Sequence, residues 1–487
     1  LFHGGAGQTP FVVGNATTNG TRAAITSAAS NTIAPTQLYN LSYIQGDIQI
    51  LTPPPTAPPE KVPVPALNPK VTIPGAAITG TPVPETKLTV PEDTFSRKFA
   101  EYFGDDAANQ AMTTESINET LLRITQQTGT KPALIYVYSR EDAVELAVFI
   151  PGTKPISKTV PEANRDRLLQ VVKQFVREVS DPRKVRTRSY LPAAQQLHQW
   201  LIDPIAAELQ AQKVTTLLFS MDTGLRSLPI AALHNGKQFL VEQYSLGLIP
   251  SISLTDTRYR SLKGAQVLAM GASKFTNLSA LPAVPAELSI ITQTLWPGTA
   301  FLNESFTLEN LKTQRQEHPY EIIHLATHGE FQPGALSNSY IQLWNTKLRL
   351  DQLRQLNWNN PPVELLVLSA CRTAFGNEEA ELGFAGIAFQ AGVKSVLASL
   401  WYVSDEGTLG LMSEFYRNLQ TAPIKAEALQ KAQIAMLRGQ VRLEDGKLRG
   451  GDQRGGLPLP PELANQGDIN LSHPFYWAAF TIIGSPW

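Results

Sequence analysis

One histidine and one cysteine of this chain stand at matching places, each where an apolar run gives way to small or polar residues. The stretch EIIHLATHGEF reaches His328 and Gly329 near its end, and VELLVLSACRTAFG reaches Cys371, the only cysteine among the 487 residues. Because the carboxyl ends of parallel strands open onto one crevice, we expect His328 and Cys371 to face each other there. The two side chains are therefore candidates for a catalytic dyad.

A thiol beside an imidazole can attack a carbonyl group. Free cysteine is only a few per cent thiolate at neutral pH, and an imidazole can take its proton and later protonate an amine leaving group. The backbone N–H groups of Gly329 and Cys371 are predicted to bind the resulting oxyanion. Two other interpretations stay open here, since a buried cysteine can pack as a small apolar side chain and a histidine can simply be hydrogen-bonded. His324, inside the same run, is interpreted as a packed or supporting residue.

Neither a metal site nor a cofactor site is predicted. One cysteine excludes a cysteine-rich metal site, and no spacing of His, Asp and Glu resembles a ligand set. GGDQRGG, at 450–456, neither follows a strand nor opens a helix, so we interpret it as a surface loop rather than a phosphate-binding loop. Lysine plus arginine is 41 and aspartate plus glutamate is 42, which argues against nucleic acid or an anionic membrane as partner. No apolar run is long enough to predict a transmembrane helix.

The apolar runs around these residues predict an α/β domain. Five short runs, TTLLFSMD, QVLAMGAS, EIIHLATHG, ELLVLSACRT and KSVLASLW, are almost continuously apolar, as strands buried on both faces are. Helical spacing between them predicts crossover helices, among them LGFAGIAFQAG, whose small residues would allow close packing on the sheet. We expect a mostly parallel sheet flanked by helices over residues 131–487.

The amino-terminal part differs in composition and predicts three further regions. Residues 1–50 are rich in Gly, Asn, Thr, Ala and Ser, which is typical of a polar arm of short strands or irregular chain. Residues 51–90 contain 11 of the 36 prolines and are predicted to be a linker. Residues 91–130 have helical spacing and are predicted to lead into the domain. The opening LFHGGAGQTP lacks the pattern of a signal peptide and has no Met, so we expect a piece of a longer chain.

Five separated stretches, in order, resemble the CHAT domain, a caspase-like cysteine peptidase module of clan CD that is related to separases. They are MDTGLRSLPIAALHNGKQFLVEQYSLGLIPS, IIHLATHGEF, LVLSACRTAFG, ELGFAGIAFQAGVKSVLASLWYVSDEGT and HPFYWAAFTIIG, and they cover most of residues 190–487. The resemblance implies a caspase-hemoglobinase fold and a protein or peptide substrate; no cofactor motif is visible in the sequence. It also implies His328 as the acid and base and Cys371 as the nucleophile.

The same resemblance implies a carboxylate that receives a basic side chain before the scissile bond. We assign this role to Asp405, with Glu381 as a second candidate, because a partly dry carboxylate pairs well with arginine or lysine. An alternative stays open, in which Asp405 caps the helix that is expected to start near Glu406.

The arm at 1–50 resembles the end of a β-helix of the filamentous-haemagglutinin type. Fusions of such a β-helix with a CHAT domain, as in cyanobacteria, would be exported or held at the cell surface; otherwise the chain would be cytoplasmic.

The predicted function is a cysteine endopeptidase. A catalytically silent interaction module and another cysteine hydrolase or acyl transferase are the alternatives. The Gly- and Pro-rich stretch 442–467 is predicted to be an exposed insertion at which the chain could be cut.

Overall fold

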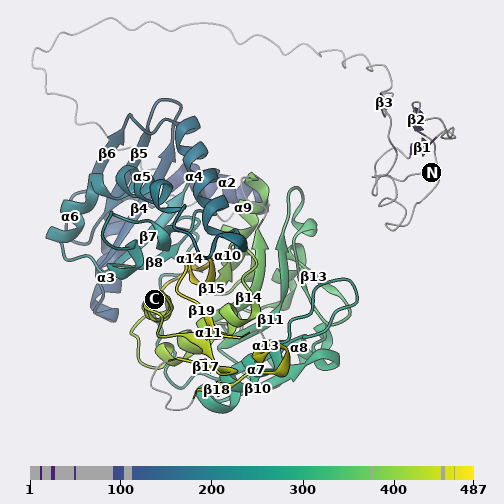
Figure 1. Ribbon diagram of the computed structural model, residues 1–487. Helices are drawn as coiled ribbons and strands as arrows, with labels where there is room; N and C mark the ends of the chain where they lie inside the picture. The colour runs from purple at the N-terminus through teal and green to yellow at the C-terminus, as the bar shows by residue number, and fades with distance from the viewer. Residues whose placement is uncertain are drawn as a thin grey trace, which may run out of the picture. The chain divides into compact units, whose positions relative to one another are not determined.

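The computed structural model separates the chain into two compact units, residues 1–83 and residues 84–487 (Figure 1). In the first unit, β1 (Phe11–Val13) pairs antiparallel with β2 (Ala24–Ser27), and β2 pairs parallel with β3 (Gln49–Ile50). The predicted linker at 51–90 lies outside the described residues. The described parts of the chain are 11–13, 24–27, 49–50, 92–103, 112–373, 377–450, 456–465 and 467–487.

The second unit is built around one large twisted sheet. Within the described residues its strand order is β10-β9-β11-β14-β15-β20-β8-β7-β4-β5-β6, and the β12–β13 hairpin pairs with the end of β11. The strands are β4 (Pro132–Ser139), β5 (Val144–Phe149), β6 (Ile156–Val160), β7 (Thr216–Met221), β8 (Ser245–Leu248), β9 (Val267–Gly271), β10 (Gly298–Leu302), β11 (Ile322–Phe331), β12 (Tyr340–Gln342), β13 (Lys347–Arg349), β14 (Leu365–Thr373), β15 (Ser395–Ser399) and β20 (Phe480–Gly484).

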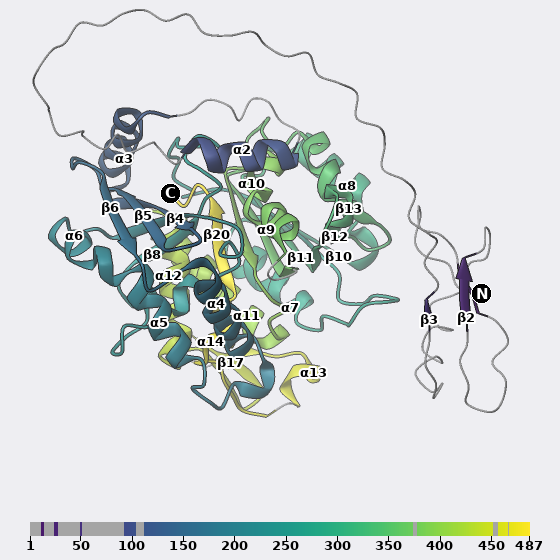
Figure 2. The same ribbon diagram turned by 90° about the horizontal axis from the view of Figure 1, so that it is seen from above.

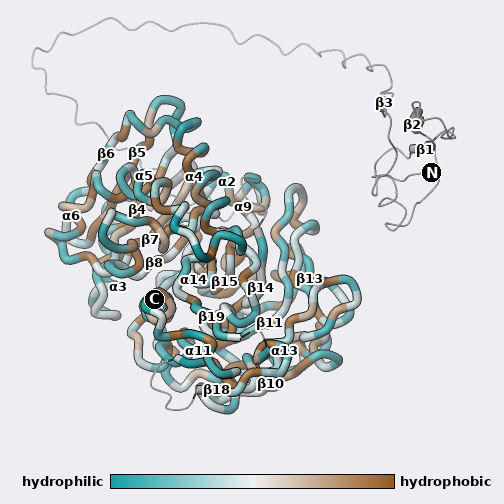
Figure 3. The backbone as a smooth tube through the Cα atoms, in the orientation of Figure 1, coloured by the Kyte–Doolittle hydropathy of each residue, from teal (hydrophilic) through white to brown (hydrophobic). Residues whose placement is uncertain are grey.

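The predicted α/β fold with a mostly parallel sheet is confirmed, and all five predicted strands form. The sheet contains two parallel blocks, β10-β9-β11-β14-β15 and β20-β8-β7-β4, which run in opposite directions because β20 pairs antiparallel with β15. Every described side chain of β7, β9 and β15 is buried, which explains their continuous apolar pattern. Apolar residues accordingly gather on the central strands (Figure 3).

Helices cover both faces of the sheet. Figure 2 shows α9 and α10 on one side of it and α7 and α11 on the other. The helices are α2 (Glu92–Phe103), α3 (Thr114–Thr128), α4 (Arg165–Val179), α5 (Leu191–Leu201), α6 (Ala206–Ala211), α7 (Val284–Ser289), α8 (Leu308–Glu317), α9 (Glu378–Ala385), α10 (Ile387–Ala391), α11 (Asp405–Leu419), α12 (Lys425–Leu437), α13 (Pro461–Ala464) and α14 (Pro474–Trp477). None of the helices in the described ranges is both long and apolar enough to cross a membrane.

Small residues in the crossover between β14 and β15 allow neighbouring elements to pack closely against it. The crossover predicted from LGFAGIAFQAG forms α9 and α10, and Gly386 lies between the two helices. A Cβ atom at Gly386 would come within 2.3 Å of the Phe103 ring of α2. Close packing of α2 on this crossover therefore requires glycine at this position.

The described residues of the stretch 442–467 contain more regular structure than the sequence indicated. It contains β16 (Arg442–Glu444), β17 (Lys447–Arg449) and β18 (Leu457–Pro458), which form a small sheet with β19 (Ile469–Asn470) in the order β18-β17-β16-β19. Asp445 and Gly446, both at positive φ, form the two-residue turn between β16 and β17, a recognised hairpin signal. This part of the predicted insertion is therefore folded into a small sheet, whereas residues 451–455 lie outside the described residues. Cutting of the chain here stays a prediction.

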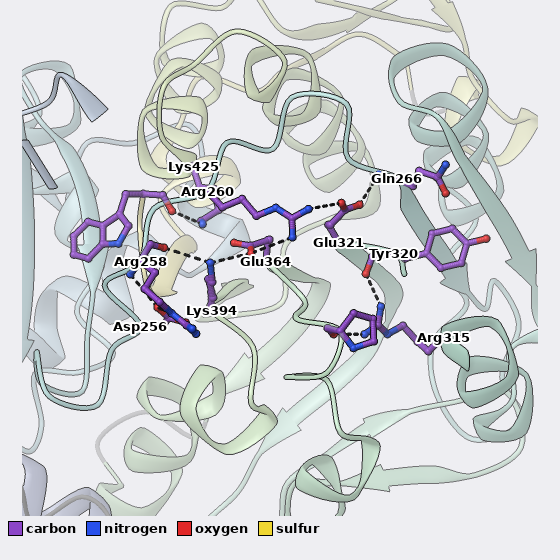
Figure 4. A network of polar contacts seen from close by, with 12 residues as sticks. Asp256, Arg258, Arg260, Gln266, Arg315, Tyr320, Glu321, Glu364, Lys394 and Lys425 are labelled. Atoms are coloured by element: carbon purple, nitrogen blue, oxygen red, sulfur yellow. Dashed lines mark hydrogen bonds and ion pairs between the residues drawn. The ribbon is translucent and has the colours of Figure 1, made fainter. Parts of the chain in front are cut away.

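A buried group of charges lies at the amino ends of β14 and β15 (Figure 4). Glu364, just before β14, is 1% exposed, and its Oε1 lies 2.9 Å from Nζ of Lys394, just before β15. Arg260 lies 3.9 Å from the same oxygen and also binds Glu321 at 2.9 Å. Burial lowers the pKa of the neighbouring Lys425 to about 8, and Glu364 opposes this shift. Charges buried this far depend on one another for compensation.

Candidate active site

The register between β11 and β14 sets the predicted site residues on neighbouring strands. His328 lies opposite Ala370 and Gly329 lies opposite Cys371, in a parallel pair. One extra residue in β11 between Leu325 and His328 interrupts the ladder, so the regular alternation of faces is broken there. Both backbone segments are near the carboxyl ends of their strands, which is the edge that the sequence indicated.

Two aromatic rings and one hydrogen bond orient the imidazole of His328. The rings of Phe275 and Tyr402 lie 4.8 Å and 5.7 Å from its centroid, and the Tyr402 ring is stacked at 23°. Nε2 lies 2.8 Å from the carbonyl oxygen of Ser279. A carbonyl can only accept, so Nε2 carries the hydrogen and Nδ1 keeps its lone pair. The orientation therefore presents Nδ1 of His328 as the basic atom.

The surroundings also keep this imidazole neutral. Burial lowers the pKa of His328 below its usual value of 6.5, and the Ser279 carbonyl and the Glu330 carboxylate oppose this effect only in part. A histidine that stays neutral at neutral pH can take a proton from a thiol. The electrostatic setting of His328 thus suits a general base.

Asp405 holds together the two segments that enclose His328. Its Oδ2 accepts a hydrogen bond from the backbone N–H of Ala283 at 3.1 Å, and its Oδ1 accepts one from the Tyr402 hydroxyl at 3.4 Å. Ala283 ends the loop that carries Phe275 and Ser279, so Asp405 ties this loop to Tyr402. Burial raises the pKa of the Asp405 carboxyl from 3.8 to about 6, helped by the nearby Glu287.

The alternative role for Asp405 as the cap of α11 is wrong. Ser404 is the cap residue, with extended backbone and a side chain that accepts from the N–H of Gly407. Asp405 is instead the first residue inside α11, because that helix begins one residue earlier than expected. Its carboxylate points to the start of α7, where Ala283 is the cap residue.

Glu381 lies where a substrate has no access to it. The side chain is completely buried in α9, Oε2 accepts from the N–H of Gly224 at 2.7 Å, and Oε1 accepts from the hydroxyl of Ser227 at 2.8 Å. Glu381 therefore holds the loop after β7 against α9. Its prediction as a second substrate-binding carboxylate is corrected for this reason, since the sequence did not reveal that this loop packs there.

His324 is a buried structural residue, in agreement with its interpretation as packed. Its exposure is 0%, Nδ1 lies 3.1 Å from the Tyr416 hydroxyl, and Nε2 lies 3.0 Å from Oε1 of Glu287. These contacts join β11 to α11 and α7 through the core.

Replacing His324 with alanine should reduce stability and leave the site intact. The change removes the imidazole from the buried Glu287 carboxylate and the Tyr416 hydroxyl, and a buried polar group that loses its partner costs about 2–3 kcal/mol. Urea unfolding of His324→Ala measures this loss. An equally stable variant would show that the two partners find compensation elsewhere.

Three groups that position His328 were not found from the sequence. Phe275 and Ser279 lie in the loop after β9, and Tyr402 lies in the loop after β15. The available signal was their place after two other predicted strands, whose carboxyl ends share the same edge. Among the described residues, no group of His, Cys, Asp and Glu is arranged to hold a metal ion.

One of the comparisons with known proteins identifies a family. The model of the family described as CHAT domain matches residues 191–485, which is more than half of the chain. A search of the curated proteins finds no match.

Several solved structures are similar at low identity. The separase–securin complex of Saccharomyces cerevisiae is 11% identical, with a TM-score of 0.43, and the match covers 80% of this chain and 33% of that chain. The Arg-specific cysteine proteinase gingipain R is 11% identical, with a TM-score of 0.37, over 66% of this chain and 75% of that chain. A complex of the pro- and mature domains of Porphyromonas gingivalis RgpB is 11% identical, with a TM-score of 0.38, over 66% and 76%. This chain thus spans about a third of the separase chain.

Proposed function

This chain belongs to the CHAT domain family, and from that premise we propose that it is a cysteine endopeptidase acting on a protein substrate. The observation that carries the proposal is the register that puts Gly329 beside Cys371 and His328 beside Ala370 on neighbouring parallel strands. The neutral, oriented imidazole of His328 supports it further.

The proposed reaction uses both residues in two stages. Nδ1 of His328 takes the thiol proton of Cys371, and the thiolate attacks the carbonyl carbon of the scissile peptide bond to form a C–S bond. The N–H groups of Gly329 and Cys371 donate to the oxyanion. As the C–N bond breaks, the imidazolium gives its proton to the leaving amine and a thioester remains. Water that is deprotonated by His328 then hydrolyses the thioester, which releases the acid product and restores the thiol.

We further propose that Asp405 receives a basic side chain before the scissile bond. A carboxylate has about four acceptor positions, and the two donors from Ala283 and Tyr402 occupy only part of them. Partial burial would strengthen its attraction for an arginine of the substrate.

The variant Asp405→Asn separates this role from a structural one. Because the pKa of Asp405 is raised to about 6, the folded state binds its proton more tightly than the unfolded chain does. The protonated carboxyl group of Asp405 therefore adds up to about 3 kcal/mol to the free energy of unfolding at low pH, and this contribution is lost as the pH rises from about 4 to about 6. The amide has no charge to bury, so Asp405→Asn should melt above the wild type at pH 7.5 and lose this advantage near pH 4.

The same variant reports on the substrate. If Asp405 receives a basic side chain, cleavage after Arg or Lys should fall by at least about tenfold while the protein melts no lower. An unchanged rate of cleavage after Arg or Lys in the variant would contradict the proposed role of Asp405. A wild type that prefers Leu or Met before the cut would contradict it as well. A stability difference that does not vary with pH contradicts the buried charge.

For the amino-terminal unit we propose a β-helix end of the haemagglutinin type, as in cyanobacterial fusions with CHAT domains. Support comes from the composition of residues 1–50 and from the pairing of β1, β2 and β3. Such a unit would hold the peptidase outside the cell or on its surface.

Incubation with a peptide library tests the peptidase proposal. Cys371 is the only cysteine, so one thiol-alkylating reagent such as iodoacetamide modifies one known position. Cleavage products that disappear after alkylation support the proposal. A protein that cuts no library peptide but captures a protein partner favours the silent interaction module instead.

A further inference from the structure

A cavity of about 770 Å³ lies beside His328, on the side of β11 that faces away from Cys371. Phe275, one of the rings that enclose His328, forms part of its wall. β11, which carries His328, lies between β14, which carries Cys371, and β12, which lines the cavity. The cavity is therefore next to the proposed dyad without being part of it.

Two segments build the walls of this cavity. The loop after β9 contributes Lys274, Phe275 and Leu278, and the β12–β13 hairpin contributes Tyr340, Trp344 and Lys347. The hairpin is anchored to the site, because Tyr340 lies opposite Glu330 of β11 and the Thr327 hydroxyl donates to the carbonyl of Gln342 at 2.6 Å. The loop is anchored by Asp405 through Ala283. Both walls are thus fixed relative to His328.

The charges of the wall have one sign. Lys274 and Lys347 are exposed, and neither forms an ion pair with any residue that the structure describes. Nζ of Lys347 lies 3.6 Å from the centroid of the Tyr340 ring. No Asp or Glu is among the described residues that line the cavity. Glu330, on the adjacent strand, accepts from Nε2 of Gln332 at 2.7 Å and does not line it.

The proposed reaction tells which half of a substrate reaches this cavity. The acyl half becomes bonded to Cys371 on β14, whereas the leaving amine takes its proton from His328 on β11. Chain that follows the amine continues beyond β11, toward β12 and the cavity. The part of the substrate after the scissile bond is thus the part that meets the two lysines and the aromatic rings.

We infer that the cavity is a specificity site for acidic substrates, which binds carboxylate side chains and an aromatic side chain just after the scissile bond. The inference rests on the proposed peptidase function and names its substrate class. Lys274 and Lys347 supply the positive charge, and Phe275, Tyr340 and Trp344 supply the apolar surface. Two lysines at the rim of a partly enclosed cavity attract a carboxylate more strongly than isolated surface lysines do, and salt weakens the attraction.

Binding to the Cys371→Ala protein tests the cavity without turnover. The probes are two fluorescein-labelled, alanine-rich decapeptides, one containing Glu-Phe-Glu and the other Gln-Phe-Gln. Fluorescence anisotropy at low salt should show the Glu peptide binding about tenfold more tightly. The preference should fall below about twofold when Lys274→Ala and Lys347→Ala are added. Lys312→Ala, an exposed lysine of α8 away from the cavity, should keep it.

The outcomes separate this inference from the peptidase proposal. Equal binding of the two peptides, or a preference that survives loss of both lysines, overturns the acidic specificity site. The wild type is then given the peptide library. Cleavage without enrichment of Asp or Glu after the cut overturns the inference and leaves the peptidase standing. In a third outcome the wild type cuts no peptide, although the Cys371→Ala protein prefers the Glu peptide. This result overturns the peptidase proposal and the assignment of the cavity to the leaving half of the substrate. The lysine-dependent binding of acidic peptides would remain.

Discussion

Cys371→Ala should abolish peptide cleavage, with a loss in kcat/KM of about 10⁴-fold or more, because no other thiol of the chain can form the thioester. His328→Ala should cause a comparable loss, since Nδ1 of this residue is the proposed base. The double variant should be no worse than either single variant, because the two residues act as a unit. Melting temperature should change little in Cys371→Ala, as cysteine and alanine differ little in volume.

The control is His318→Ala, which removes an exposed histidine just before β11 and should cleave normally. Steady-state kinetics on one peptide substrate compare the four variants with the wild type. Burial lowers the pKa of His328, so the neutral base persists below pH 6.5 and the acidic limb of the kcat/KM profile should lie below that value. Turnover retained in Cys371→Ala would refute the mechanism.

Glu364→Gln should destabilise the domain by about 3–5 kcal/mol, because it leaves the buried ammonium of Lys394 without its carboxylate. Lys425, also buried in this group, loses the same compensating charge (Figure 4). The network lies at the amino ends of β14 and β15, so the folded fraction of the variant should still cleave. Urea unfolding, followed by fluorescence, measures the loss.

Glu427→Gln is the matched control, because Glu427 pairs with Lys431 at 2.8 Å on the surface of α12. An exposed pair four residues apart in a helix contributes about 0.3–0.5 kcal/mol, so this variant should unfold almost as the wild type does. Equal losses in the two variants would show that burial of the Glu364 pair adds nothing. A stabilised Glu364→Gln would mean that the desolvation cost of the group exceeds its mutual attraction.

Sequence patterns predicted the strands and the crossover helices well, because these elements depend on residues that are close together in the chain. A strand buried on both faces must be apolar throughout, and β7, β9, β11, β14 and β15 were all visible for that reason. The turn at Asp445 and Gly446 was equally local, yet the surrounding glycines and prolines outweighed it in our interpretation. The direction of β7 relative to β11 was not visible, since an apolar run has the same pattern in either direction.

By itself the sequence determined that His328 and Cys371 end two neighbouring apolar runs, and hence that both belong to one edge of a parallel sheet. Only the tertiary structure decided what each nearby carboxylate does. Glu381 binds the loop after β7, and Asp405 ties Ala283 to Tyr402, although both were predicted from similar positions after strands. The physical reason is that a carboxylate takes its role from the donors packed against it, and the donors on Gly224, Ser227 and Ala283 come from segments more than 100 residues away in the chain.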